Sequence, residues 1–275
     1  MDYRDYFRGF GRPGLLALRS IAHFNSKDFN RRVRGERPRR SQRVTLALYV
    51  LVALGTFAAG QDVDLKARVE LTRNGRKVHD ASKVVVWLTP VGNTTATSAP
   101  VQTTIPQLVQ KNKSFQPSLL VIPAGGKVEF PNHDPFFHNV FSLFDGKRFD
   151  LGLYESGSTQ FVKFDKPGIS YIFCNIHAQM SAVVIAVATP YYAVSNWRGD
   201  IDISGVAPGR YQMHVFHPSV SREVLAAAER EITVSGTGSL GTISLAESNL
   251  EIAHKNKYGK DYDPSDPESP AYARP

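Results

Sequence analysis

Apolar and polar residues alternate along several stretches of the chain, and this period of two predicts β-strands. The clearest case is residues 63–71, where Asp, Lys, Arg and Glu separate the apolar positions. Asn74–Gly75 then predicts a tight turn, and the more continuous apolar run of residues 81–88 predicts a second, more deeply buried strand. These patterns are typical of an all-β protein.

Further strands are predicted along the rest of the chain. They cover residues 118–122, 127–130, 170–173, 181–187, 197–203 and 206–216. Between them, residues 90–104 are rich in Thr, Ala, Pro and Asn and predict a linker loop. Residues 248–275 have no apolar period and predict a flexible, solvated tail, although the tyrosines at 258, 262 and 272 are able to dock onto the body.

One stretch is apolar and uncharged throughout, at residues 44–59. It is shorter than the roughly 20 residues of a comfortable membrane-spanning helix and longer than most signal-peptide cores. Ala58, Ala59 and Gly60 supply the small residues that a signal peptidase needs. Cleavage after Gly60 is therefore favoured over an uncleaved membrane anchor.

The net charge of +8 is confined to the start of the chain, because residues 1–43 hold 12 Lys and Arg against 4 Asp and Glu. A basic region before an apolar segment is a topology signal, so no nucleic-acid partner is inferred. Residues 1–43 fit a long basic leader, a cytoplasmic tail, or sequence upstream of the true start. The expected location is periplasmic or extracellular, with membrane contact only through an uncleaved residues 44–59 segment anchored in the inner membrane.

The distinctive chemistry lies in a seven-residue stretch, Cys-Asn-Ile-His-Ala-Gln-Met, that begins at Cys174. Cys174 is the only cysteine, so no disulfide can form within the chain. The predicted strands at 170–173 and 181–187 flank the stretch and make it a tight loop between two strands. Cys174, His177 and Met180 can therefore point a thiolate, an imidazole and a thioether at one position.

A second imidazole, His138, lies 36 residues before Cys174 at the entrance to a predicted strand. Two His, one Cys and a weak axial Met are the ligands of a blue-copper electron-transfer site. We therefore predict one metal site, formed by His138, Cys174, His177 and Met180. Copper ligation would also hold the lone cysteine as a thiolate.

Three other histidines are weaker candidates for metal ligands. His133 is an alternative to His138, but it lies in Asn-His-Asp-Pro, which predicts a turn. His214 and His217 are three positions apart along a predicted strand, so they face opposite sides and cannot chelate one ion together.

Motifs within residues 105–188 carry a resemblance to a known family. They are Phe130-Pro131-Asn132, His138-Asn139-Val140, Gly168, Tyr171 and Cys174-x2-His177-x2-Met180. This region resembles the cupredoxins, and its short ligand loop is most similar to amicyanin and its plastocyanin-like relatives. The resemblance implies an eight-stranded Greek-key β-sandwich with one type 1 copper ion (Cu+/Cu2+). It implies that His138, Cys174 and His177 are equatorial ligands, Met180 is axial, and Asn139 braces the ligand loop without binding the metal.

A second resemblance involves residues on both sides of this copper unit. Residues 199–211 are similar to the end of carboxypeptidase-regulatory or transthyretin-like modules, and residues 69–88 are similar to their beginning. We therefore predict a discontinuous β-sandwich of residues 62–92 and 190–247. The copper unit of residues 105–188 would be inserted between its strands.

These observations predict a one-electron carrier outside the cytoplasm, with no catalytic residues. The sequence has no second Cys–His cluster, Gly-x-Ser-x-Gly motif, P-loop or Rossmann glycine motif. His177 is the expected electron exit toward a transient redox protein partner. The alternatives are a copper-binding or delivery protein, or a cell-surface β-sandwich binding module without redox turnover.

Overall fold

The computed structural model describes residues 61–94, 101–143, 146–236, 238–248 and 255–262. Strands dominate this part of the chain, which confirms the all-β class. The basic region of residues 1–43 and the apolar segment of residues 44–60 lie outside the described residues. Within the described ranges, no helix has both the length and the apolar character needed to span a membrane.

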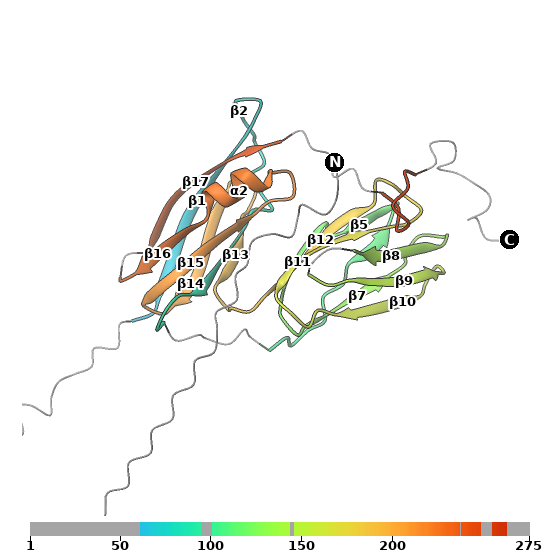
Figure 1. The fold of residues 1–275 in the computed structure, drawn as a ribbon, viewed down its shortest axis with the longest axis horizontal. Coiled ribbons are helices and arrows are strands. Elements are labelled where there is room, and N and C mark those ends of the chain that lie inside the picture. The colour runs from blue at the N-terminus through green and yellow to red at the C-terminus, as the bar shows by residue number, and fades with distance from the viewer. Residues whose placement is uncertain (1–60, 95–100, 144–145, 237, 249–254, 263–275) are drawn as a thin grey trace, which may run out of the picture. The chain divides into compact units, whose positions relative to one another are not determined.

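Residues from before and after the middle of the chain form one β-sandwich, which we call the flanking sandwich. Its strands are β1 (Val63–Arg73), β2 (Arg76–Lys77), β3 (Val85–Pro90), β13 (Tyr192–Val194), β14 (Asp200–Val206), β15 (Gly209–Phe216), β16 (Arg230–Val234) and β17 (Ser239–Glu247). One sheet has the order β14–β1–β17, with β2 paired to β1, and the other has the order β13–β3–β15–β16 (Figure 1).

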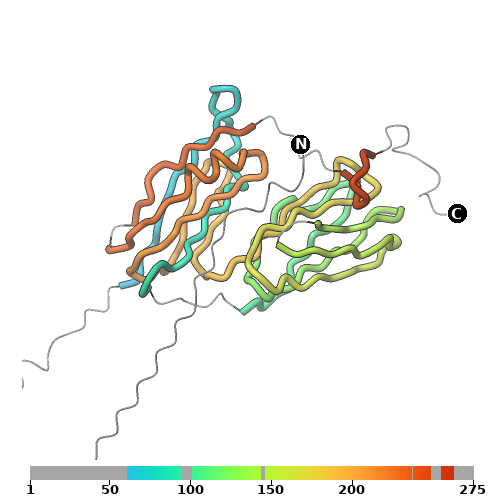
Figure 2. Tube along the Cα trace, viewed as in Figure 1, coloured from blue at the N-terminus to red at the C-terminus, as the bar shows by residue number. Residues whose placement is uncertain are grey.

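Among the described residues, the first strand of the flanking sandwich pairs only with its own hairpin partner and with strands that follow the middle of the chain. β1 is antiparallel to β14 and parallel to β17, and the blue and orange traces of β1 and β17 run side by side in Figure 2. Because Leu65, Val69 and Leu71 are each at most 2% exposed while the residues between them reach solvent, the period of two buries one face of β1. Each such side chain contributes roughly 1.5–3 kcal/mol by leaving water.

Turn chemistry sets several strand ends in the flanking sandwich. Asn74 and Gly75 both have positive φ angles, of 51° and 74°, and close the β1–β2 hairpin as predicted. The prediction of a strand from residue 81 is wrong at its start, since β3 begins at Val85. Lys83 has a φ of 66°, and the Ser82 amide donates to the Asp80 carboxylate, so this segment turns instead of extending.

Two further details of the flanking sandwich differ from the sequence prediction. β14 begins at Asp200 instead of residue 197, because the Asn196 side chain accepts hydrogen bonds from the amides of Arg198 and Asp200 and holds a turn. Helix α2 (Arg222–Ala228) was not predicted. Ser221 caps it by accepting a hydrogen bond from the Val224 amide.

The middle of the chain forms a second β-sandwich, which we call the central sandwich. Its strands are β4 (Val109–Lys111), β5 (Ser114–Gln116), β6 (Leu119–Pro123), β7 (Lys127–Pro131), β8 (His138–Ser142), β9 (Phe149–Tyr154), β10 (Thr159–Lys163), β11 (Gly168–Phe173) and β12 (Ser181–Val187). A five-stranded sheet has the order β6–β12–β11–β8–β9, and β7 pairs with β10 (Figure 1). The predicted strands at 118–122, 127–130, 170–173 and 181–187 are confirmed to within two residues.

After Ser181, β12 is apolar throughout because both of its faces are buried. Ala182, Val184 and Ala186 belong to the core of the central sandwich, together with Phe130 and Ile172. The alternate residues of β12 join a third cluster, which consists of Val85, Val183, Ile185, Val187 and Phe216. The continuous apolar run thus reflects burial on two sides.

Candidate metal centre

The loop that carries the candidate ligands is held closed at both ends. β11 ends one residue before Cys174, and β12 begins one residue after Met180. The two strands pair antiparallel up to Phe173 and Ser181. Inside the loop, the Cys174 amide donates to the Met180 carbonyl at 3.2 Å, and the Met180 amide donates to the His177 carbonyl at 3.1 Å. These bonds fix the direction of the side chains between the strands.

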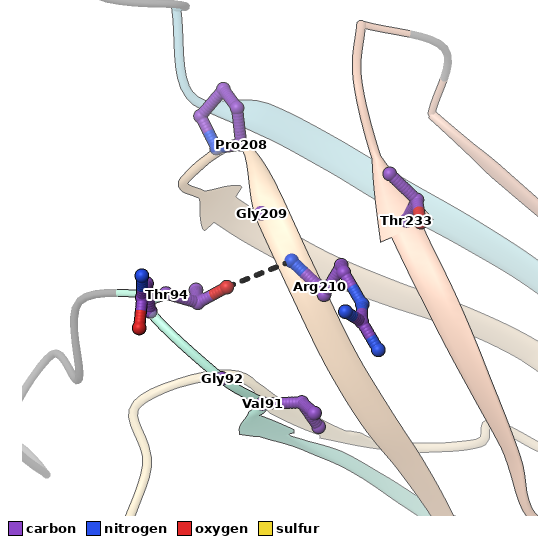
Figure 3. A pocket seen from close by; sticks show the side chains of 8 residues that line it. Val91, Gly92, Thr94, Pro208, Gly209, Arg210 and Thr233 are labelled. Atoms are coloured by element: carbon purple, nitrogen blue, oxygen red, sulfur yellow. Dashed lines mark hydrogen bonds between the residues drawn. The ribbon is translucent and has the colours of Figure 1, made fainter.

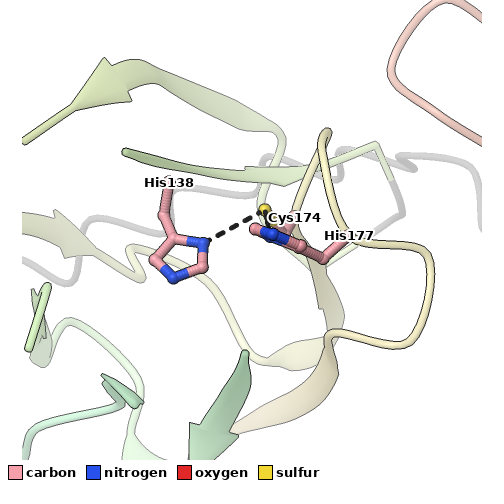
Figure 4. A group of neighbouring side chains, drawn as sticks. All are labelled: His138, Cys174 and His177. Atoms are coloured by element: carbon pink, nitrogen blue, oxygen red, sulfur yellow. Dashed lines mark hydrogen bonds between the residues drawn. The ribbon is translucent and has the colours of Figure 1, made fainter. Parts of the chain in front are cut away.

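His138 reaches the loop from the neighbouring strand. It is the first residue of β8, which pairs with β11 at Phe141 and Phe173. Figure 4 shows its imidazole turned toward the Cys174 sulfur, with His177 arriving from the loop. Three residues that are distant in sequence or separated by a turn are therefore brought to one point.

The donor atoms of His138, Cys174 and His177 have the spacing that one ion requires. The Cys174 Sγ lies 3.7 Å from His138 Nδ1 and 3.6 Å from His177 Nδ1. All three donors lie within 4.8 Å of one another. Metal bonds of about 2.0 Å to nitrogen and 2.3 Å to sulfur, opened to a trigonal angle, separate the two donors by about 3.7 Å. The side chains thus match a trigonal N–S–N site.

The three donors are shielded from water, and this sets their protonation. His138 and Cys174 have no exposed surface, and His177 is 7% exposed. Burial lowers the pKa of His138, and burial together with the nearby charges of His138 and Lys113 lowers the pKa of His177 to about 4. Both imidazoles are therefore neutral near pH 7 and able to offer a lone pair.

The sulfur of Cys174 is surrounded by backbone donors. Burial raises the pKa of the thiol, whereas hydrogen bonds from the amides of Asn139, Ile176 and His177 act to lower it. In a buried site a metal cation deprotonates a coordinating thiol outright. The amides already point at the atom that would then carry the negative charge.

Met180, the predicted axial ligand, is fully buried in the same core cluster as Cys174. Asn139 contacts both β9 and the ligand loop. Its side-chain amide donates to the Asp150 carboxylate at 2.7 Å and to the Gly152 carbonyl at 2.9 Å, both in β9. The side chain thus braces β8 against β9, and the contact with the ligand loop is made by the Asn139 backbone amide.

An aromatic ring covers the two imidazoles. The ring centroid of Phe136 lies 5.2 Å from that of His138 and 5.7 Å from that of His177. The Lys113 ammonium lies over the Phe136 ring, 5.7 Å from its centroid. This arrangement limits the access of water and lowers the local dielectric around the donors.

The three weaker histidine candidates, His133, His214 and His217, lie outside the cluster. His133 is exposed. His214 stacks on Trp87 and contacts Thr89 and Glu229, whereas His217 is buried near Glu247. The two do not share a partner among the bonds of the described residues.

One contact at the centre was missed by the sequence analysis, and a second was left open by it. Asp134 accepts a hydrogen bond from His138 Nε2 at 2.7 Å.

The segment of residues 255–262, predicted as part of a solvated tail, lies against the ligand loop (dark red in Figure 2). There Lys257 donates its amide to Asn175, and Tyr262 donates its hydroxyl to the Cys174 carbonyl. Tyr258 is 71% exposed, and Tyr272 lies outside the described residues.

A surface hollow in the flanking sandwich has a different character (Figure 3). It is lined by Val91, Gly92, Asn93, Thr94, Pro208, Gly209, Arg210 and Thr233. The Arg210 amide donates to Thr94 Oγ1 at 2.9 Å, and the Arg210 guanidinium pairs with Glu231. The lining residues include no His, Cys or carboxylate, so this hollow offers no second metal centre within the described residues.

Comparisons with known proteins give partial likenesses. No family model and no curated protein matches the sequence. The copper-containing nitrite reductase from Thermus scotoductus SA-01 is 24% identical with a TM-score of 0.30, over 36% of this chain and 25% of that enzyme. The chain thus spans about a quarter of that protein's length.

Two smaller proteins are similar over most of their own length. A purple cupredoxin from Nitrosopumilus maritimus is 22% identical with a TM-score of 0.27, over 30% of this chain and 99% of that one. Amicyanin from Paracoccus versutus is 20% identical with a TM-score of 0.29, over 36% of this chain and 97% of that one. The evidence for the candidate metal centre is therefore the distances between its own side chains and the burial of those side chains.

Proposed function

We propose that the central sandwich binds one type 1 copper ion and transfers single electrons. The observation that carries this proposal is that the Cys174 sulfur lies 3.6–3.7 Å from the Nδ1 atoms of His138 and His177, with all three side chains buried. A soft thiolate favours Cu+, and imidazole accepts both copper states. A trigonal arrangement that suits both states lets the charge change with little ligand movement.

Met180 is proposed as the weak axial ligand. Its burial beside Cys174 and the bonds that tie its backbone to the loop support this role. Three strong donors and one thioether favour copper over zinc, because structural zinc sites hold four strong nitrogen or sulfur ligands.

Electron transfer is proposed in preference to catalysis. A copper enzyme needs an open coordination position for its substrate, whereas Phe136 and the surrounding core enclose this centre. His177 is proposed as the electron exit, because it is 7% exposed while His138 is 0% exposed. A redox protein that docks briefly over His177 would be the partner, and such encounters use small interfaces.

The location and the flanking sandwich complete the proposal. The basic residues 1–43 and the apolar residues 44–59 support export from the cytoplasm, to a periplasmic or extracellular site. The pairing of β1 with β14 and β17 supports a carboxypeptidase-regulatory-like sandwich that carries the copper unit as an insertion.

Visible spectroscopy of the copper-loaded protein tests the function. We expect an intense thiolate-to-copper band and reversible one-electron redox behaviour in the wild-type protein. Cys174→Ser should abolish the band while leaving the far-UV spectrum of the β-fold unchanged. A colourless protein whose copper is weakly held and readily lost would contradict the proposal and favour copper delivery or a binding module.

A further inference from the structure

Asp134 contacts the face of His138 that is turned away from the other donors. Its Oδ2 lies 2.7 Å from His138 Nε2, while His138 Nδ1 faces the Cys174 sulfur at 3.7 Å. The side chain of Asp134 is 5% exposed and that of His138 is 0% exposed. A carboxylate is thus buried directly behind a candidate metal ligand.

The backbone of a neighbouring turn holds this carboxylate in place. The amide of Asn112 donates to Oδ1 at 2.6 Å, and the amide of Lys113 donates to Oδ2 at 3.0 Å. Both residues have positive φ angles, of 54° and 51°, in the turn between β4 and β5. Asp134 also donates its own amide to the Asn132 side chain at 3.0 Å. The turn therefore donates two amide hydrogen bonds to the carboxylate of Asp134, while the Asn132 side chain holds the backbone of the same residue.

This geometry selects one form of the His138 ring. An ionised carboxylate only accepts hydrogen bonds, so the proton of the neutral imidazole must lie on Nε2. The Nδ1 atom that faces Cys174 then keeps its lone pair. A carboxylate behind a ligating histidine fixes both the tautomer and the ring orientation in this way.

The charge of Asp134 also reaches the rest of the site. The His138 ring and the amides of Asn112 and Lys113 all lie within hydrogen-bond distance of the Asp134 oxygens, and this arrangement suits an ionised carboxylate, which only accepts hydrogen bonds. Its charge acts on the Cys174 thiol as well. A buried negative charge stabilises the more positive oxidation state of a nearby ion, because little water screens it.

We propose that Asp134 is a positioning residue that fixes the tautomer of His138 and lowers the reduction potential of the copper centre. The part concerning the potential rests on the proposed copper function, whereas the part concerning the tautomer belongs to the protein without metal. The two parts can therefore be tested separately.

Long-range ¹H–¹⁵N correlation spectra of the metal-free protein near neutral pH test the first part. We expect His138 to be the neutral Nε2–H tautomer in the wild-type protein and a mixture of tautomers in Asp134→Ala. A wild-type protein with the proton on Nδ1 would overturn the proposal, whether or not copper binds. This measurement on the wild type needs no variant to fold.

Voltammetry of the copper-loaded protein tests the second part. Asp134→Asn keeps the size of the side chain, and its amide oxygen can still accept a hydrogen bond from His138, but the substitution removes the charge. We expect its reduction potential to shift upward from that of the wild type. Asp165→Asn is the matched control, because Asp165 is a carboxylate of the same sandwich that pairs with Lys147 at the surface. An Asp134→Asn shift no larger than that of the control would overturn the role in the potential. Failure of the wild type to bind copper would instead refute the proposed function and leave the tautomer result standing.

Discussion

The hydroxyl of Tyr262 donates a 2.6 Å hydrogen bond to the main-chain carbonyl of Cys174, 88 residues earlier in the chain. Beside it, the Lys257 amide donates to Asn175, and the Lys257 ammonium pairs with Asp150 at 2.7 Å. The segment of residues 255–262 is therefore fastened to the ligand loop and to β9. The residue that supplies the candidate sulfur ligand is thus supported from outside its own sheet.

Tyr262→Phe removes this hydrogen bond while keeping the ring. We expect the free energy of unfolding to fall by about 0.5–1.5 kcal/mol, which is typical for one hydrogen bond. Amide hydrogen exchange across the ligand loop should accelerate, because the loop loses one of the hydrogen bonds that restrain it. Tyr258→Phe is the control, since Tyr258 is 71% exposed, and it should change neither quantity. Equal exchange rates in the two variants would show that the segment does not brace the loop.

Phe136→Ala should open the candidate centre to water. Phe136 is half-buried, so the loss of stability should be smaller than the roughly 3–5 kcal/mol of a fully buried Phe. The larger effect should be on the metal, because the ring that covers His138 and His177 is gone. We expect copper to transfer to an external chelator at least several times faster. Phe161→Ala, at a ring that is 64% exposed, should leave the transfer rate unchanged.

His217 should make the stability of the metal-free protein depend on pH. Burial lowers the pKa of His217 in the folded state below the ordinary value of 6.5. Below pH 6.5 the unfolded chain therefore binds a proton that the folded chain does not, and the free energy of unfolding falls as the pH falls toward the folded-state pKa. The slope from one group is at most about 1.4 kcal/mol per pH unit.

Urea denaturation at several pH values measures this dependence. His138 and His177 contribute to the same decline, because burial lowers their pKa values as well. His217→Gln should therefore make the decline just below pH 6.5 less steep without removing it, whereas His133→Gln, at an exposed position, should leave it as in the wild type. Asp134 and Asp150 act at lower pH, because their pKa values lie below 3.8. An unchanged slope in His217→Gln would assign the decline to other groups.

Gly199→Ala should damage the flanking sandwich. Gly199 has a φ of +86°, its carbonyl accepts the Val69 amide at 2.7 Å, and a Cβ at this position would lie 2.3 Å from the Val69 carbonyl oxygen. Backbone strain and the clash together should cost roughly 2–5 kcal/mol of stability.

A comparison of Gly157→Ala with Gly199→Ala separates the cost of backbone strain from the cost of the steric clash. Gly157 has a similar φ of +78°, but a Cβ there would meet no atom within 4 Å, so the cost should be only about 1–2 kcal/mol. Equilibrium denaturation of both variants checks the comparison. Equal losses would mean that the close approach of Gly199 to β1 is relieved by a small backbone shift.

The parts of the molecule that could be predicted from the sequence are those that produce a recognisable pattern of residues over a short stretch. The alternation in β1 follows from a sheet with one buried face, and the ligand loop follows from three chemically distinctive side chains between two apolar runs. His138 could be chosen over His133 because an apolar strand follows it directly. The short spacing of these signals makes them visible without knowledge of the fold.

The features that the sequence did not decide leave no clear pattern of residues along the chain. Asp134 is placed by amides of the turn at residues 112–113, which leave no side-chain pattern. Tyr262 lies in a polar segment whose docking uses hydrogen bonds instead of an apolar face. Helix α2 spans only seven residues and none of them is fully buried, so it is too short for an apolar stripe to repeat along it.

β17 is the last strand of the described residues, and this position has a consequence for biosynthesis. A nascent chain makes β1 early, yet the parallel partner of β1 emerges from the ribosome only after both the central sandwich and helix α2. The contiguous strands β4–β12 can fold as soon as they emerge, whereas the flanking sheet must wait for the last strand to close it. A chain released before residue 239 would therefore carry every candidate copper ligand on an unfinished support, with the edge of β1 open to aggregation.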